Sequence, residues 1–273
     1  MDFTSIIGLV AGIILVVYGI GMDKIGNFLD TPSALIVVGG TVAAVVASFP
    51  LRILKNVPKH FKILLQGKNN PAKIIEEMVD LAQFARRNGL LALEDRANEL
   101  KDPFFKQSVL LIVDAMDTEK VRELLETQVD MMSDRHEENT VLYDKAAAYS
   151  PSFGLIGTLI GLINMLKSMN MDAGGSNDMG KNMAVAMITT FYGCVLASLV
   201  FSPIAKKLRI RNEEEVLYKQ LIIEGVISIQ SGDNPKFLKE KLVSYLEQGQ
   251  QKRILEGKDS TGKEKAAQEA MDL

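Results

Sequence analysis

The chain has 273 residues and a formal net charge of −3, from 31 Lys and Arg against 34 Asp and Glu. This near-neutral balance argues against a nucleic-acid-binding protein, which usually carries a strong basic excess. The single cysteine, Cys194, excludes an internal disulfide framework. Hydrophobic residues make up 47% of the chain, and their very uneven distribution is the main signal in the sequence.

Four stretches are almost free of charged residues, and each is close to the about 20 residues that an α-helix needs to cross a bilayer. Buried core helices are the minor interpretation, because strongly charged segments lie beside these stretches. The first stretch could instead be a cleaved signal peptide, but it lacks a basic start and a small-residue cleavage site, so we expect a retained span. The four predicted spans cover residues 3–21, 33–51, 153–169 and 183–204.

The basic residues predict how the spans are oriented. They gather after the second and fourth spans, whereas the two short connections inside the hairpins hold few of them. By the positive-inside rule, both hairpin tips then face outside, and both termini and the middle segment face the cytoplasm. The basic residues concerned are Arg52, Lys55, Lys59, Lys62 and Lys68, and then Lys206, Lys207, Arg209 and Arg211.

The middle segment is predicted to be helical throughout. Asn70 and Pro71 are a favoured pair for the N-cap and first residue of a helix, and Gly89 after Asn88 indicates its end. A last long helix continues without Gly or Pro into the third span, and the fourth span continues inward in the same way. The further predicted helices cover 91–100, then 103–116 after Asp102, and then a stretch from Asp117 or Thr118 through Tyr149.

These elements predict an all-α membrane protein with four transmembrane helices in two hairpins, a large helical cytoplasmic insert and a cytoplasmic tail. The last residues have few large apolar side chains, so we expect them to be disordered. The predicted parts are hairpin 1 over 1–51, the cytoplasmic helical domain over 52–147, hairpin 2 over 148–205, the helical tail over 206–255 and the disordered C-terminus over 256–273.

Small residues recur at four-residue spacing in all four spans, a pattern that lets helix backbones approach closely in lipid. For the first two spans, packing within one chain is as plausible as any other role. For the last two, we favour packing between subunits or around a central partner. The rows contain Gly8 and Gly12, then Gly40, Ala44 and Ser48, then Gly154, Gly157 and Gly161, and finally Gly193 and Ala197.

No Asp, Glu, Lys, Arg or His lies in the interior of the four predicted spans. A proton or cation pathway normally needs an ionisable group at membrane depth. Either another protein supplies a carboxylate, or the chain conducts nothing and its threonines bond to their own helices. The residues alone leave both readings open. The neutral polar candidates for lining a pathway are Thr158, Thr189 and Thr190, with Ser198 and Tyr192 beside them.

Two prolines occupy matching places, Pro151 near the cytoplasmic start of the third span and Pro203 near the cytoplasmic end of the fourth. A proline removes a backbone hydrogen bond and can kink a helix. Both could be ordinary boundary residues. Because each lies where a long cytoplasmic helix meets its span, the pair could instead transmit movement between membrane and cytoplasm.

The segment "RRNGLLALE" places Arg86 in the last turn of one predicted helix and Glu94 in the first turn of the next. Those positions favour these charges through the helix dipole, which is a complete structural explanation by itself. Neither a metal-ligand cluster nor a Gly-rich phosphate loop nor a nucleophile elbow is visible, since His60 and His136 are isolated in the sequence. We therefore expect no enzyme, no cofactor and no metal site.

The whole pattern resembles the MotA/PomA family, the stator A-subunits of the bacterial flagellar motor. The resemblance covers nearly the full length and includes "SPSFGLIGTLIGLINML", "AVAMITTFYGCVLASLVFSPIAKKL" and "RRNGLLALE". The wider MotA/TolQ/ExbB ion-channel group shares the latter spans but typically has three. The N-terminal hairpin therefore favours the flagellar branch.

The resemblance implies a pentamer in the bacterial inner membrane, arranged around two copies of a MotB or PomB B-subunit that supplies the ion-binding aspartate. Ion flow would drive torque on the rotor, and we favour the proton over sodium, although Thr158 with Thr189 and Thr190 is similar to sodium-using members. The alternatives are an ExbB/TolQ-like energiser of an envelope process and a non-conducting membrane scaffold. In this resemblance Thr158 and Thr190 match pore-facing positions, Pro151 and Pro203 match functional prolines at the channel mouth, and Arg86, with Arg87 adjacent, and Glu94 match the charged pair that contacts the rotor protein FliG.

Overall fold

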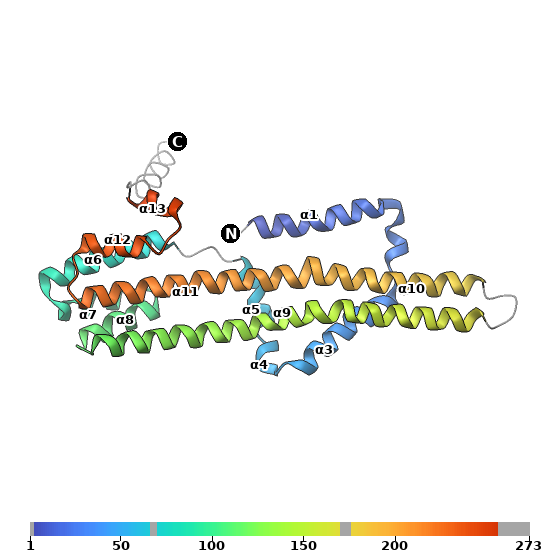
Figure 1. The fold of residues 1–273 in the computed structure, drawn as a ribbon, viewed down its shortest axis with the longest axis horizontal. Coiled ribbons are helices and arrows are strands. Elements are labelled where there is room, and N and C mark those ends of the chain that lie inside the picture. The colour runs from blue at the N-terminus through green and yellow to red at the C-terminus, as the bar shows by residue number, and fades with distance from the viewer. Residues whose placement is uncertain (1–2, 66–69, 170–175, 256–273) are drawn as a thin grey trace. The chain divides into compact units, whose positions relative to one another are not determined.

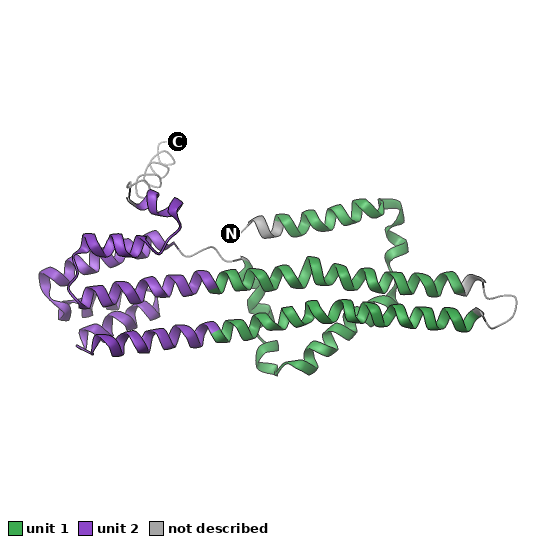
Figure 2. Ribbon diagram, in the orientation of Figure 1, with its two compact units in different colours: residues 1–67, 134–212 green, residues 68–133, 213–273 purple. Residues whose placement is uncertain are grey.

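The computed structural model describes residues 3–65, 70–169 and 176–255, and within these ranges the chain forms helices without a β-strand (Figure 1). The chain divides into two compact units (Figure 2). Unit 1 comprises residues 1–67 and 134–212, and unit 2 comprises residues 68–133 and 213–273. Two of the three unit boundaries fall inside long helices and the third lies outside the described residues, so the compact units divide the chain differently from the predicted parts.

Unit 1 begins with α1, Phe3–Ile20, which turns by 95° into the 3₁₀ helix η1, Met22–Phe28. The next helix runs unbroken from Thr31 to Ser48 and contains a π-helical stretch in its middle. It consists of α2 (Thr31–Ala34), η2 (Leu35–Gly39) and α3 (Gly40–Ser48). By length and composition, three described helices can cross a membrane, and the bent pair of α1 and η1 provides a fourth.

The two hairpins are joined at the tip of the first. Asp30 caps α2 by accepting hydrogen bonds from the backbone N–H and the hydroxyl of Ser33, at 2.8 and 2.5 Å. The Tyr192 hydroxyl, far along the chain, donates to the carbonyl of Phe28 and accepts from the Asp30 N–H at 3.3 Å. Phe28 also meets Phe191 edge to face, with ring centroids 5.3 Å apart. We call the hydrogen bonds of Tyr192 with Phe28 and Asp30 the tyrosine latch. The latch connects the tip of the first hairpin to the fourth span.

The third and fourth spans are each continuous with a long charged helix, as the sequence predicts. Helix α9, Thr118–Met169, has 52 residues and contains Pro151 in its interior. The other long helix runs through a second π-helical stretch, so that α10, η4 and α11 follow one another directly. Their bounds are Ser176–Val195, Leu196–Phe201 and Ser202–Gln230.

Unit 2 is a helical bundle whose cap residues follow the sequence prediction. The Asn70 side chain accepts from the Ala72 N–H at 3.1 Å, and Asp102 accepts from the Phe104 N–H at 2.9 Å. Gly89 ends its helix at φ +86°, a left-handed conformation that suits glycine. The helices are α6 (Pro71–Asn88), η3 (Leu90–Ala92), α7 (Leu93–Glu99), α8 (Pro103–Val113), α12 (Pro235–Val243) and α13 (Gln248–Leu255), with parts of α9 and α11.

One ion-pair cluster links three helices of unit 2. The Glu224 carboxylate accepts from Arg122 at 2.5 Å and from Lys241 at 2.8 Å. Burial by itself would raise the pKa of Glu224, but hydrogen bonds from the two cations outweigh burial and lower that pKa below its usual value. The cluster therefore holds α9, α11 and α12 together around a largely buried charge.

The structure differs from the predicted elements in three places. The second span ends at Ser48, because Phe49 and Pro50 are extended and Pro50 has no N–H to continue the helix. Two short helices follow, α4 (Leu51–Leu54) and α5 (Val57–Leu65), in the segment predicted to be helical, but their individual bounds were not predicted. The π-helical stretches were not predicted either. The expected disordered C-terminus lies outside the described residues.

Candidate functional site

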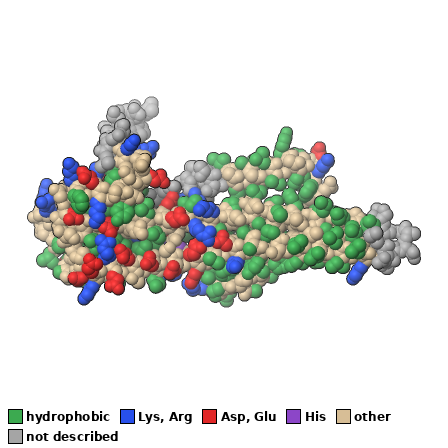
Figure 3. All heavy atoms as spheres, in the orientation of Figure 1, with side chains coloured by type: hydrophobic (Ala, Val, Ile, Leu, Met, Phe, Trp, Pro, Cys, Tyr) green, Lys and Arg blue, Asp and Glu red, His purple; other side chains and the backbone are tan. Residues whose placement is uncertain are grey.

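The membrane-spanning part of unit 1 leaves most of its large apolar side chains exposed. On the face drawn in Figure 3, α10 and the later half of α9 carry mainly hydrophobic side chains, whereas charged side chains gather over unit 2 and the adjoining turns of unit 1. Such a surface requires lipid or other subunits around it. Examples on three helices are Ile14, Leu15 and Tyr18, then Val42 and Val46, then Leu155, Leu159 and Leu166.

A row of glycines brings α9 and α10 into close contact. A Cβ atom on Gly154 would lie 2.9 Å from the carbonyl oxygen of Thr189, and one on Gly193 would lie 2.7 Å from that of Ser150. Gly157 faces the Thr189 side chain, and Gly161 would place a Cβ 2.6 Å from the Asn182 carbonyl oxygen. The four glycines thus pack within one chain, whereas the sequence analysis favoured packing between subunits.

The other small residues behave less uniformly. Ala197, in η4, is buried, and a Cβ on Gly12 would lie 3.1 Å from the Leu199 side chain in the same stretch. Gly40 faces the ring of Phe153 on α9. Gly8 has no atom of the described chain within 4 Å of where its Cβ would be. Close approach within the chain therefore explains Gly12 and Gly40 but not Gly8.

Next to the glycine row, hydroxyl and carbonyl oxygens form a small cluster. The Thr158 hydroxyl lies 2.5 Å from that of Thr190 and 2.9 Å from the Ala186 carbonyl oxygen. The Thr190 hydroxyl also donates to the same carbonyl, at 3.3 Å. Thr158 is half-buried and Thr190 is exposed, so this oxygen cluster reaches the surface of the chain. We define the oxygen cluster as these three groups.

Thr189 differs from the two neighbouring candidates. Its side chain is fully buried against Gly157, and its hydroxyl donates to the Val185 and Ala186 carbonyl oxygens of its own helix, each at 3.0 Å. Among the three candidates, Thr158 and Thr190 thus have accessible side chains, whereas Thr189 is buried. The assignment of Thr189 to a pathway stays a prediction, and its burial against Gly157 does not support it.

The two prolines lie beside this contact. Pro151 is exposed inside α9, where its missing N–H leaves the Ala147 carbonyl without its usual helical partner. Its Cα would be 3.0 Å from a Cβ on Gly193, so the kink-prone position packs directly on α10. Pro203 follows the π-helical η4 by two residues. A π-helical turn is a frequent feature of functional helices, and here it immediately precedes the proline.

Outside the predicted spans, α5, α9 and α11 of unit 1 carry a network of polar contacts. Arg209 on α11 donates to Glu137 at 2.9 Å and to Asp144 at 2.5 Å, both on α9. His60 Nδ1 lies 3.0 Å from the Tyr143 hydroxyl. Burial lowers the pKa of His60, as does the positive charge that His136 can carry, and burial raises the pKa of Tyr143 to about 12. The two histidines, isolated in the sequence, are thus neighbours electrostatically.

The predicted rotor-contact residues lie on the surface of unit 2. Arg86 and Arg87 are exposed in the last turn of α6, and Glu94 is exposed in the first turn of α7. Among the described residues, none of the three forms an ion pair. Between them Leu91 is 77% exposed. The charges are therefore available to a partner, although their helix-end positions also suit the dipole explanation.

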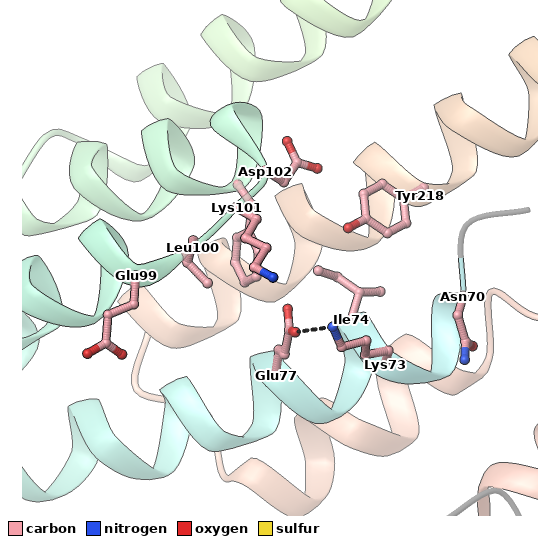
Figure 4. A pocket seen from close by; sticks show the side chains of 10 residues that line it. Asn70, Lys73, Ile74, Glu77, Glu99, Leu100, Lys101, Asp102 and Tyr218 are labelled. Atoms are coloured by element: carbon pink, nitrogen blue, oxygen red, sulfur yellow. Dashed lines mark ion pairs between the residues drawn. The ribbon is translucent and has the colours of Figure 1, made fainter. Parts of the chain in front are cut away.

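A polar pocket of about 270 Å³ lies elsewhere in unit 2, between α6, α11 and the connection from α7 to α8 (Figure 4). Its lysines face carboxylates, and Lys73 pairs with Glu77 at 3.4 Å. Burial and nearby acids raise the pKa of Tyr218 to about 12. The mixed charges largely cancel, so the pocket does not suggest an anion or a cation as ligand. The lining residues are Asn70, Lys73, Ile74, Glu77, Glu99, Leu100, Lys101, Asp102, Phe105 and Tyr218.

Known proteins match nearly the whole chain. The family model described as the MotA/TolQ/ExbB proton channel family matches residues 96–220. Motility protein A of Borreliella burgdorferi is 39% identical over 250 residues, which cover 90% of this chain and 94% of that protein. The chain belongs to the MotA/TolQ/ExbB proton channel family. The family description names a channel rather than an enzyme, and the predicted resemblance is confirmed.

Further members of the MotA/TolQ/ExbB family match over similar lengths. Chemotaxis protein PomA of Vibrio alginolyticus is 36% identical over 94% of this chain and 99% of its own. The flagellar MotAB stator complex of Bacillus subtilis contains a chain with a TM-score of 0.85 and 30% identity, covering 93% of this chain and 99% of that one. C. jejuni MotAB gives a TM-score of 0.83 at 28% identity, with 91% and 97% coverage. These structural matches confirm the all-α fold.

Proposed function

We propose that this chain is the A-subunit of a flagellar stator, which couples ion flow across the inner membrane to torque on the rotor. The observation that carries the proposal is the combination of similarity to MotAB stator structures over most of the chain with predicted spans that hold no charged side chain in their interior. An ion pathway then requires a carboxylate from a B-subunit of the MotB or PomB type.

The proposed assembly is a pentamer of this chain around two B-subunits, with both termini of the chain in the cytoplasm. The exposed apolar faces of α1, α3 and α9 support an assembly in which some are covered by lipid and others by neighbouring subunits. The basic residues after the second and fourth spans support the orientation.

In the proposed mechanism, the oxygen cluster of Thr158, Thr190 and the Ala186 carbonyl faces the partner's aspartate. When that aspartate gains or loses its ion, the local charge changes, and α9 and α10 shift about the joints at Pro151 and Pro203. The cytoplasmic parts of α9 and α11 then carry the movement to unit 2, whose Arg86 and Glu94 push on FliG. One ion crossing about 100 mV supplies roughly 2.3 kcal/mol per charge, enough to bias a two-state step.

The proton is the first candidate for the coupling ion. Sodium is the second candidate, and the oxygen cluster is the observation in its favour. Three neutral oxygens within hydrogen-bonding distance of one another can act as ligands for a hard cation. A proton pathway does not need such a cluster, so the ion dependence of rotation separates the two candidates.

The proposal predicts that the chain alone conducts no ions. Purified alone and reconstituted in liposomes, it should give no proton or sodium flux above that of empty liposomes, because the interior of its predicted spans holds no Asp, Glu, Lys, Arg or His. Co-reconstitution with the B-subunit should produce flux, read with pH-sensitive and sodium-sensitive dyes.

The control is the same complex with the membrane aspartate of the B-subunit replaced by asparagine, and this complex should give no ion flux. Sustained flux from this chain alone would contradict the proposed division of labour. Flux without any effect of the chain on motility would favour an ExbB/TolQ-like energiser, and absence of flux in every combination would favour a non-conducting scaffold.

Charge reversal at the rotor surface tests the FliG contact. Arg86→Glu or Glu94→Arg should impair swimming strongly while the complex with the B-subunit still assembles, because both side chains are exposed and belong to none of the predicted spans. A matched control is Arg253→Glu, which removes an exposed arginine from the last turn of α13 and so costs a similar dipole interaction, about 0.3–1 kcal/mol. The control should swim normally. If compensating charge reversals on FliG fail to restore swimming, the dipole explanation is sufficient.

A further inference from the structure

The segment that joins the second span to the cytoplasmic domain is anchored to the protein by one face only. It comprises α4 and α5, which start two residues after the span ends. Ile53 and His60 are buried, His60 lies against the Tyr143 hydroxyl, and Asn56 donates to Asn139 at 3.3 Å. The segment is therefore held against α9 and is not a free linker.

The opposite face combines exposed apolar side chains with exposed lysines. Leu51 is 70% exposed and Phe61 51%. Lys55, Lys59 and Lys62 are also exposed, and none of them makes an ion pair with another residue in the described parts of the chain. This second set of side chains, the basic–apolar face, has no partner within the described chain.

The charge on this face is not balanced by nearby acids. Between Asp30 and Glu76 the sequence has no Asp or Glu, and Arg52, the remaining cation of the face's own helices, is already paired with Glu138 on α9 at 2.8 Å. A large aromatic ring such as that of Phe61 gains nothing from facing water. A ligand of this face must therefore offer both apolar groups and negative charge.

The position of the face indicates what meets both demands. Only Phe49 and Pro50 separate it from the last residue of a membrane span, so it starts at the edge of the bilayer. Helices with apolar side chains interleaved with lysines lie in the membrane interface, where the apolar groups enter the acyl region and the lysine stems reach the headgroups. Juxtamembrane lysines attract anionic lipids.

We propose that the basic–apolar face of α4 and α5 is a binding site for anionic phospholipids in the leaflet at which the second span ends. Leu51 and Phe61 enter the acyl layer, and Lys55, Lys59 and Lys62 hold the phosphate headgroups. The site goes beyond ion conduction and rotor contact. It fixes the depth of the second span and places the first cytoplasmic turns of α9 against the lipid surface through His60 and Tyr143.

The chain has no tryptophan, so a single introduced one reports on this face. The complex with the B-subunit, carrying Phe61→Trp, is reconstituted in phosphatidylcholine and phosphatidylglycerol bilayers with bromine on the acyl chains of one lipid at a time. The complex without the substitution gives the background emission. We expect quenching per brominated chain to be about twofold stronger from phosphatidylglycerol, because the lysines enrich the anionic lipid. Phe237→Trp, at an exposed position on α12, should stay unquenched by either lipid.

The triple variant Lys55→Gln, Lys59→Gln and Lys62→Gln should reduce the preference for phosphatidylglycerol to parity, whereas Lys101→Gln, Lys120→Gln and Lys236→Gln together should leave it unchanged. If Phe61→Trp prevents assembly, Leu51→Trp takes its place. Equal quenching by the two lipids would overturn the proposed anionic selectivity. Absence of quenching at both positions would overturn the lipid site and would point to a protein on this face. Flux and swimming are not read out, so the result tests lipid binding separately from ion conduction and rotor contact.

Discussion

Gly193→Ala is expected to disrupt the contact between α9 and α10 and with it the assembled complex. The new methyl group would lie 2.7 Å from the Ser150 carbonyl oxygen and 3.0 Å from the Pro151 Cα, and both are backbone atoms that cannot rotate away. Overpacking of this kind typically costs about 1–3 kcal/mol, and the cost is at the upper end where two backbones must separate. We expect a lower thermal midpoint of the purified complex and less co-purified B-subunit.

Gly8→Ala is the matched control, since it makes the same change inside a predicted span where no described atom lies within 4 Å of the new methyl group. It should be neutral, or stabilising by roughly 0.5–1 kcal/mol through helix propensity. If the two variants behaved alike, the glycine at 193 would not be required by the helix contact. Gly154→Ala, against the Thr189 carbonyl, should reproduce the loss seen with Gly193→Ala.

Pro151→Ala is expected to give a complex that assembles and is at least as stable, yet rotates slowly or not at all. The substitution returns an N–H to the interior of α9 and removes the clash of the proline ring, which together are worth up to about 3 kcal/mol in a helix interior. A stiffer helix at position 151 no longer bends when the aspartate of the B-subunit gains or loses its ion. Pro203→Ala should have the same effect on the helix that follows η4. The measurement is rotation speed per assembled stator, with assembly checked by co-purification of the B-subunit.

Pro235→Ala serves as the matched proline control, because Pro235 occupies the first turn of α12, where a proline removes no helical hydrogen bond. Rotation should be unaffected by that substitution. Normal rotation in both Pro151→Ala and Pro203→Ala would assign these prolines to helix boundaries only.

The parts of the fold that depend on local chemistry were predictable from the sequence. Asn70 before Pro71, and Asp102 before Pro103, have an N-cap side chain and a proline next to each other, and both helices begin where that pairing predicts. The continuity of α9 through Pro151 was also predictable, since the surrounding sequence contains no other helix breaker before Gly154.

The parts that depend on contacts far along the chain were not predictable. Thr189 is as polar as Thr190, and only the packing of Gly157 on α9 decides which of them is buried. His60 and His136 are neighbours because α5 folds against α9. The π-helical stretches consist of the same small and apolar residues as the α-helical turns beside them, so the residue types do not reveal them.

The tyrosine latch has a consequence for how the chain is made. Its two ends are 162 residues apart, so Asp30 leaves the ribosome long before Tyr192 exists. At about 5–20 residues per second, the first hairpin waits in the bilayer for roughly 8–30 s before its partner is synthesised. During that interval the turn depends on its own contacts, and Asp30 already supplies them through Ser33. The turn of the first hairpin therefore has its own stabilising contacts while the rest of the chain is still being synthesised. The tyrosine latch forms only after Tyr192 has been added.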